Sequence, residues 1–239
     1  MMILITKLFQ MNFHRTIRFL FLNIGFLLIV KFYYSQNSDF QTWSSIEIEK
    51  KIIKSVSISI EEEVRIAQNS TSFNTSNTSI SGLYSFNKFI KAGIGYRYSY
   101  SYDIEDGYSV SHRLMVDGVL KYKLGDFAFS FRERFQDDWQ TEKTSPTATY
   151  PDLYLRHKLQ IKYNVPKISL FPYLEAELFQ SLNNPIQNKV DKYRWTAGLE
   201  YDFKNDLSVS LFYRIQDSHK VLKKRNEIYI LGTGISYEF

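Results

Sequence analysis

Three ionisable side chains lie on the apolar side of segments in which apolar and polar residues alternate. They are His112, Glu133 and His157, one in each of three successive segments. A histidine beside a carboxylate can act as a general base, and with a serine nucleophile the set would catalyse ester hydrolysis or acyl transfer. No outward serine completes a triad, however, and simple hairpin pairing sets Glu133 opposite Val116, too far from His112 for direct contact. We therefore expect no enzyme, and keep a lipid-modifying hydrolase or acyltransferase as an alternative.

Other signatures of catalysis or cofactor binding are missing from the sequence. It has no phosphate-binding glycine loop, no HExxH motif and no nucleophile elbow. The four histidines, His14, His112, His157 and His219, do not have the spacing of metal ligands. There is no cysteine, which excludes disulfides and thiolate metal sites. We expect neither a cofactor nor a metal.

The polar side of the same segments carries a second set of charged residues. Its basic members lie on four successive segments: Arg97, Arg113, Arg132, Arg134, Arg156 and Lys158. Its acidic members lie mainly on the segments to either side: Glu61, Glu63, Glu175, Glu177 and Glu200. If the segments form a closed sheet, these side chains share its interior. They would form either an ion-pair network that fills a narrow lumen or the constriction of a small pore that favours anions.

The segments themselves have the period of β-strands. From residue 90 to residue 102, apolar or aromatic residues alternate with polar residues or glycine without a slip. The connections alternate as well. Short turns are expected at residues 87–88, 123–126, 164–167 and 204–206, and longer polar segments at residues 67–77, 103–107, 137–152, 181–191 and 217–226. Short turns on one rim and longer loops on the other are typical of an outer-membrane β-barrel.

Aromatic residues mark both ends of the expected strands. Those near the longer connections are Tyr98, Tyr100, Tyr102, Tyr108, Tyr193 and Trp195, and those near the short turns are Tyr122, Tyr163, Tyr201, Phe203, Tyr237 and Phe239. Two aromatic girdles fit a wall that faces lipid. A soluble β-sandwich or lipocalin-like fold would also alternate, but strands of ten or more residues can cross a bilayer at a tilt. We predict an all-β fold, a transmembrane antiparallel up-and-down β-barrel of 10 to 12 strands.

One segment leaves the strand number open. Ten strands between residues 55 and 239 would form five hairpins, and residues 42–50 add an eleventh candidate. That segment could pair with the next strand or fold into the lumen as a short plug. Twelve strands, with one not visible in the sequence, are a further possibility.

The beginning of the chain has the character of an export signal. Lys7, Arg15 and Arg18 precede an apolar run over residues 19–30, which is shorter than a membrane-spanning helix needs. We predict a signal peptide over residues 1–35 and an outer-membrane β-barrel domain over residues 36–239. Four of the 30 Lys and Arg residues lie in this signal, with no acid beside them, so 26 basic residues face 25 acidic ones in the remainder. The net charge of +5 therefore gives no reason to expect nucleic acid as a partner.

Several strand motifs together resemble a known family. They are WSSIEIEKKI followed by SISIEEEVRI, then FIKAGIGYRYSY, HRLMVDGVLKYKLG and RHKLQIKY, with an aromatic terminus. In these stretches the chain is similar to an uncharacterised bacterial outer-membrane family, domain of unknown function 2490 (DUF2490), over most of residues 40–239. The resemblance implies a fold and a location in the outer membrane, and it implies no activity.

The expected function follows from the fold. We predict an exported, porin-like barrel of the cell outer membrane with unknown cargo, either a small pore or a barrel with a packed lumen. A surface-binding or adhesion barrel that acts through loops at residues 68–79 and 137–152 is an alternative. The expected partners are outer-membrane lipid and, through Tyr237 and Phe239 in the last strand, the assembly machinery of that membrane. The sequence does not indicate a soluble partner.

Overall fold

The chain is described here by a computed structural model that covers residues 38–103, 107–140, 152–184, 188–203, 205–219 and 226–239. The predicted signal peptide over residues 1–35 lies outside these ranges. Within them every regular element is a strand: β1 (Ser38–Ile53), β2 (Val56–Ala67), β3 (Ser72–Ser85), β4 (Ile90–Asp103), β5 (Gly107–Leu124), β6 (Phe127–Gln140), β7 (Asp152–Tyr163), β8 (Leu170–Ser181), β9 (Val190–Asp202), β10 (Leu207–Ser218) and β11 (Asn226–Glu238). No helix in the described part of the chain is long and apolar enough to cross a bilayer.

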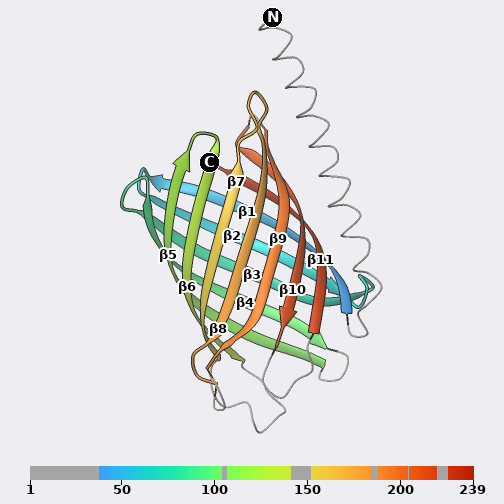
Figure 1. Cartoon of the computed structure of the whole chain (residues 1–239). Helices are drawn as coiled ribbons and strands as arrows, with labels where there is room; N and C mark the ends of the chain where they lie inside the picture. The colour runs from blue at the N-terminus through green and yellow to red at the C-terminus, as the bar shows by residue number, and fades with distance from the viewer. Residues whose placement is uncertain (1–37, 104–106, 141–151, 185–187, 204, 220–225) are drawn as a thin grey trace, which may run out of the picture. The chain divides into compact units, whose positions relative to one another are not determined.

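The strands form a closed barrel in chain order (Figure 1). Each consecutive pair is antiparallel, and β1 closes the barrel by pairing with β11 in parallel, from Ser38 opposite Glu227 to Glu49 opposite Glu238. An odd number of strands makes this parallel contact necessary, because the first and last strands then run in the same direction. The eleven strands lie within the predicted range of 10 to 12.

The additional segment over residues 42–50 belongs to the barrel wall. It is part of strand β1 and pairs with β2, with Thr42 opposite Ile66 and Lys50 opposite Ile58. The possibility of a short plug in the lumen was therefore wrong. Ile46 and Ile48 face outward from this strand and Glu47 faces the lumen, so its alternation matches that of the other strands.

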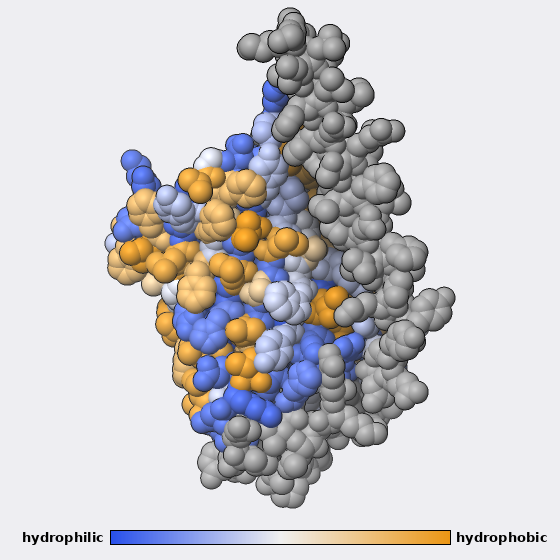
Figure 2. Space-filling view, viewed as in Figure 1, coloured by the Kyte–Doolittle hydropathy of each residue, from blue (hydrophilic) through white to orange (hydrophobic). Residues whose placement is uncertain are grey.

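Side chains alternate between the outside and the inside along each strand. The outward set is apolar and exposed, with Ile94 70% and Leu174 63% accessible, whereas the inward set includes charged residues that are almost fully buried, such as Arg156 and Glu177. Figure 2 shows apolar side chains spread over the visible outer face with polar ones between them. A barrel with an apolar outside and a polar inside is the reverse of a soluble one.

The two rims differ in their connections, although less than predicted. Residues 54–55, 86–89, 125–126 and 164–169 connect strands at one rim, which we call the short-turn rim; β9 ends and β10 begins at this rim, and Phe239 lies there too. At the other rim lie the adjoining ends of β2 and β3, β4 and β5, β6 and β7, β8 and β9, and β10 and β11. Most of the predicted aromatic positions are exposed, for example Tyr100 and Tyr108 near one rim and Tyr122 and Phe239 near the other, although Trp195 lies in the middle of β9.

The predicted polar loop over residues 67–77 was wrong. Only residues 68–71 connect β2 to β3, and Ser72 begins a full strand. Its polar side chains have partners on β2: Ser76 and Thr78 donate to the Glu62 carboxylate on the outer face, and Asn77 donates to Glu63 on the inner face at 3.0 Å. These polar residues are thus held in the strand by cross-strand hydrogen bonds. Most of the proposed binding loop at residues 68–79 is therefore barrel wall.

Candidate functional site in the barrel lumen

The lumen encloses a cavity of about 510 Å³. Among the described residues, ten cationic and eight acidic side chains line it, a net charge of +2. The cations are Arg65, Arg97, Arg113, Arg132, Arg134, Arg156, Lys158, Lys192, Arg194 and Arg214, and the acids are Glu47, Glu61, Glu63, Asp117, Asp138, Asp152, Glu175 and Glu177. The strand alternation places all of these side chains on the inward face, as the period of two requires. All predicted lumen residues except Glu200 meet at this cavity.

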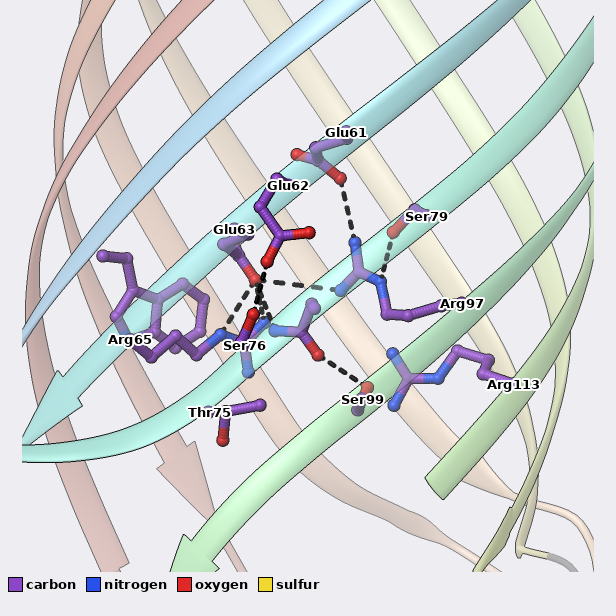
Figure 3. A network of polar contacts seen from close by, with 12 residues as sticks. Glu61, Glu62, Glu63, Arg65, Thr75, Ser76, Ser79, Arg97, Ser99 and Arg113 are labelled. Carbon is purple, nitrogen blue, oxygen red and sulfur yellow. Dashed lines mark hydrogen bonds and ion pairs between the residues drawn. The ribbon is translucent and has the colours of Figure 1, made fainter. Parts of the chain in front are cut away.

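On β2 to β4 the charges balance (Figure 3). Arg97 on β4 donates to Glu61 at 3.0 Å and to Ser79 at 2.8 Å, and its second terminal nitrogen lies 3.8 Å from Glu63. Arg65 also donates to Glu63, at 2.6 Å. Two arginines therefore face two glutamates, and their planar donors satisfy both carboxylates.

On β5 and β6, two arginines are paired with carboxylates across the hairpin. Arg134 forms a bidentate ion pair with Asp117: its Nε donates to Oδ1 and its Nη2 to Oδ2, each at 2.6 Å. Arg113 makes the same kind of contact with Asp138. The sequence prediction put basic residues on one wall and acids elsewhere, but in the structure these two arginines have carboxylate partners on their own wall.

Glu177 on β8 is shared by several cations. Its Oε1 accepts from Arg132 and from Arg156, each at 2.8 Å, and its Oε2 lies 3.6 Å from Arg194. The Glu177 side chain is 7% exposed. The Nε atoms of Arg132 and Arg156 are buried and have no acceptor within the described ranges. A single buried carboxylate thus serves three guanidinium groups.

Glu175, two residues earlier on the same strand, serves two more cations. It accepts from Lys158 at 3.1 Å, and Arg214 lies 3.9 Å away. Gln160 donates to it as well, at 2.8 Å. We call the two carboxylates and their five cations the Glu175–Glu177 cluster; five positive and two negative charges give it a net charge of +3.

Glu200 lies apart from the cavity. It accepts from Lys162 at 2.8 Å, nearer the short-turn rim, and lines separate, smaller pockets. Both side chains are more exposed than Glu177, at 29% for Glu200 and 26% for Lys162. The structure therefore assigns Glu200 to a simple ion pair outside the central layer.

Aromatic side chains inside the lumen were missed from the sequence. Trp43 is 3% exposed, donates to Gln41 at 2.9 Å, and stacks against the Arg65 guanidinium at 3.7 Å from the ring centre. Phe179 likewise lies 4.3 Å from Arg156 and 4.7 Å from Arg194. Such cation–π contacts hold the guanidinium planes in place. Trp43 lies an even number of residues from Gln41 and Glu47, so the alternation of the strand puts it on the same inward face. This signal was available in the sequence, but the prediction placed aromatic residues in the lipid-facing girdles.

Three lumen arginines were also left out of the sequence prediction. They are Arg65, Arg194 and Arg214, whose positions share the parity of Glu63, Thr196 and Gln216. Arg194 donates to Gln216 at 2.7 Å, and Arg214 donates to Thr196 at 2.9 Å. Parity alone would have placed them inside, because each lies on a strand that the alternation had already identified.

The outward ionisable residues form two separate contacts. Glu133 and His157 lie directly opposite each other on β6 and β7, with Oε2 and Nδ1 2.8 Å apart. His112 is opposite Trp139 and stacks on it, and its Nδ1 is 2.6 Å from the Tyr96 hydroxyl. Glu133 is opposite Gly118 and not opposite Val116 as predicted. The register thus places His112 six residues along β5 from the level of Glu133.

The last strand ends in an exposed aromatic pair. Phe239 stacks on Tyr237 with ring centres 5.9 Å apart, and the Lys50 ammonium lies 4.9 Å from the Phe239 ring. The Phe239 amide donates to Glu49 at 3.0 Å, and its carbonyl accepts from Lys51 at 3.2 Å. These contacts fix Phe239 at the parallel seam between β1 and β11. Its role in assembly stays a prediction.

Two solved structures show distant likenesses to the chain. One structure, described as "Bacterial polysaccharide outer membrane secretin", is 11% identical with a TM-score of 0.43, over 73% of this chain and 72% of that chain. Another, described as "Unveiling the Mechanism Behind the in-meso Crystallization of Membrane Proteins", is 14% identical with a TM-score of 0.38, over 79% and 78% of the two chains. At these scores neither likeness bears on function. No curated protein matches the chain.

The family comparison covers most of the barrel. The family described as "Protein of unknown function (DUF2490)" matches residues 40–226, from β1 to the start of β11. This agrees with the resemblance seen in the strand motifs. The chain belongs to the DUF2490 family.

Proposed function

We propose that this protein is an integral barrel of the bacterial outer membrane whose lumen is closed by its own side chains. The outward wall supports the membrane location: large apolar residues are exposed along every strand and would be costly in water. Export by the signal at residues 1–35 and assembly through the last strand are parts of the same proposal. The proposed role is structural and involves no catalysis.

The proposal of a closed lumen depends on one observation, the set of ion pairs that Glu177 forms with Arg132, Arg156 and Arg194, which we call the Glu177 hub. Arg132, Arg156 and Arg194 come from three different strands and converge on one carboxylate. Together with the paired arginines on the facing strands, they leave only the cavity of about 510 Å³ at this level. A water-filled channel of the porin type belongs to barrels of more strands. Diffusion through this lumen would require several buried ion pairs to separate at once.

Planar-bilayer recordings test the proposal. Purified protein should insert without giving stable conductance steps at moderate voltage, because buried ion pairs block the lumen. A variant that shortens the hub cations, such as Arg132→Ala with Arg156→Ala, is the positive control and should conduct if it folds. Steady, ohmic conductance of the wild-type protein would refute the closed lumen and favour a small pore. Separation of inner and outer membranes tests the location independently.

A further inference from the structure

The charge of the lumen is unevenly distributed. On β2 to β6, Glu61, Glu63, Asp117 and Asp138 are matched one for one by arginines. On β6 to β10, the Glu175–Glu177 cluster has five cations for two carboxylates, a net charge of +3. In the described part of the chain, the remaining charged groups at the cavity are Glu47, Asp152 and Lys192, which contribute a net charge of −1. The excess positive charge is therefore concentrated on one wall.

This excess is held in a shielded place. Side-chain exposure in the cluster ranges from 7% for Arg156 to 24% for Lys158. Charges of one sign at such sites repel each other strongly, because little water screens them. An anion with several oxygens is the complementary ligand, since guanidinium groups donate to phosphate, sulfate and carboxylate in a two-pronged geometry.

The cluster is also prepared for such a ligand. Phe179 supports Arg156 and Arg194 from one face, so their planes are oriented before any ligand arrives. Arg194 and Arg214 use neutral acceptors, Gln216 and Thr196, for their Nε donors. The cavity of about 510 Å³ borders the cluster. The sheet lies between this cavity and the apolar side chains on the outer face of the barrel. A water-soluble anion therefore fits better than a lipid headgroup.

We propose that the lumen binds a small, water-soluble oxyanion of the phosphate or sulfate type at the Glu175–Glu177 cluster. The anion would lie in the cavity against Arg156, Arg194 and Arg214 and would offset the excess charge. This assignment rests on the proposed closed lumen and adds to it a ligand class. The bound anion would complete the ion-pair layer that closes the barrel.

Tryptophan fluorescence provides the test. Of the three tryptophans, Trp43 lies in the lumen, with Arg194 and Arg214 5.5 and 5.4 Å from its ring. Trp139 and Trp195 face outward, so the double variant Trp139→Phe, Trp195→Phe makes Trp43 the reporter. Sodium phosphate and sodium sulfate are titrated into the full barrel in phosphate-free detergent, with sodium chloride at matched ionic strength as the reference. We expect a saturable change in Trp43 emission with phosphate or sulfate and none with chloride.

A nearly isosteric variant shows where the anion binds. Gln216→Glu keeps the shape of the side chain and gives Arg194 a carboxylate, which reduces the cluster charge from +3 to +2. It should weaken phosphate binding about tenfold, the worth of one hydrogen bond to a charged group. Ser130→Asp is the matched control, because it adds the same charge near the short-turn rim beside Lys121 and Lys162. It should change the affinity less than Gln216→Glu does.

Two results would overturn the assignment. One is the absence of any saturable response to phosphate and sulfate in a barrel that circular dichroism shows to be folded. The other is equal affinity in the wild type and Gln216→Glu. The titration needs no membrane, so a conducting wild-type protein would refute the closed lumen and leave this site standing. A silent titration would remove the site and leave the closed lumen standing.

Discussion

Replacing Glu177 by glutamine should destabilise the barrel far more than the same substitution elsewhere in the lumen. The glutamine side chain has nearly the shape of glutamate but no charge, so Arg132, Arg156 and Arg194 would lose their shared counter-charge. Removing one partner from a buried ion pair costs about 3 to 5 kcal/mol. We expect the free energy of unfolding of Glu177→Gln to fall by about this amount.

Glu200→Gln is the matched control. Among the described residues Glu200 has one ion-pair partner, Lys162, and both side chains are more than a quarter exposed. A partly exposed pair contributes about 1 kcal/mol or less. Equilibrium urea unfolding from lipid vesicles, followed by tryptophan fluorescence and by the gel mobility of the folded barrel, measures both variants. A loss for Glu177→Gln no larger than that for Glu200→Gln would refute the hub as a main support of the fold.

A rescue variant separates charge from shape. Gln216→Glu supplies a new carboxylate to Arg194. In the double variant Glu177→Gln, Gln216→Glu it should recover part of the lost stability, with a coupling energy of about 0.5 to 3 kcal/mol. If the two effects simply add, the loss in Glu177→Gln comes from altered packing and the electrostatic reasoning fails.

Three further predictions concern the wall of the barrel. His157→Leu removes the partner of the Glu133 carboxylate on the outer face and should lower the free energy of unfolding. The double variant Glu133→Leu, His157→Leu should be as stable as the wild type or more stable by about 1 to 4 kcal/mol. A double variant less stable than the single variant in urea unfolding would contradict this prediction. Gly232→Ala should cost about 1 to 3 kcal/mol because its Cβ would meet the Phe212 ring, while Gly118→Ala, with open space around it, is the control. Equal midpoints of urea unfolding for the two glycine variants would contradict this prediction and show that the Phe212 ring moves aside at little cost. Phe239→Ser should lower the fraction of protein recovered as folded barrel in the outer membrane more than Phe127→Ser, a similarly exposed aromatic at the same rim. Equal recovery of these two variants would contradict a special role of Phe239 in assembly.

The sequence predicted the wall of the barrel well where alternation was strong. β4 shows why: its aromatic and isoleucine residues alternate with glycine, serine and charged residues, and the strand has the predicted facing. β3 shows the limit, because its first six residues, SFNTSN, are mostly polar and do not alternate, and they were predicted as a loop. Their place in the wall depends on Glu62 and Glu63 of the neighbouring strand, which no local pattern reveals.

Facing was easier to predict than pairing. The alternation along each strand placed the predicted arginines and glutamates inside the barrel. Their ion-pair partners depend instead on the pairing register between neighbouring strands. The hairpin between β5 and β6 is an example: a turn over residues 123–126 was expected, whereas Leu124 pairs with Phe127 around a two-residue turn. Gly125 has a φ of +58°, as the first position of such a tight hairpin turn favours. This difference shifts every pair on the two strands by two residues and sets Glu133 opposite Gly118 instead of Val116.

Site-directed spin labelling through β4 tests most directly whether the protein is a closed barrel in a membrane. The chain has no cysteine, so single cysteines from residue 92 to residue 98 can be labelled without background. In lipid vesicles, labels at the outward positions Ala92, Ile94, Tyr96 and Tyr98 should be accessible to oxygen and protected from a water-soluble relaxing agent. Labels at the inward positions Gly93, Gly95 and Arg97 should be protected from oxygen and from a water-soluble relaxing agent too large to enter the cavity beside them. Access of the water-soluble agent to the outward positions would contradict a lipid-facing wall, and access to every inward position would contradict a closed lumen.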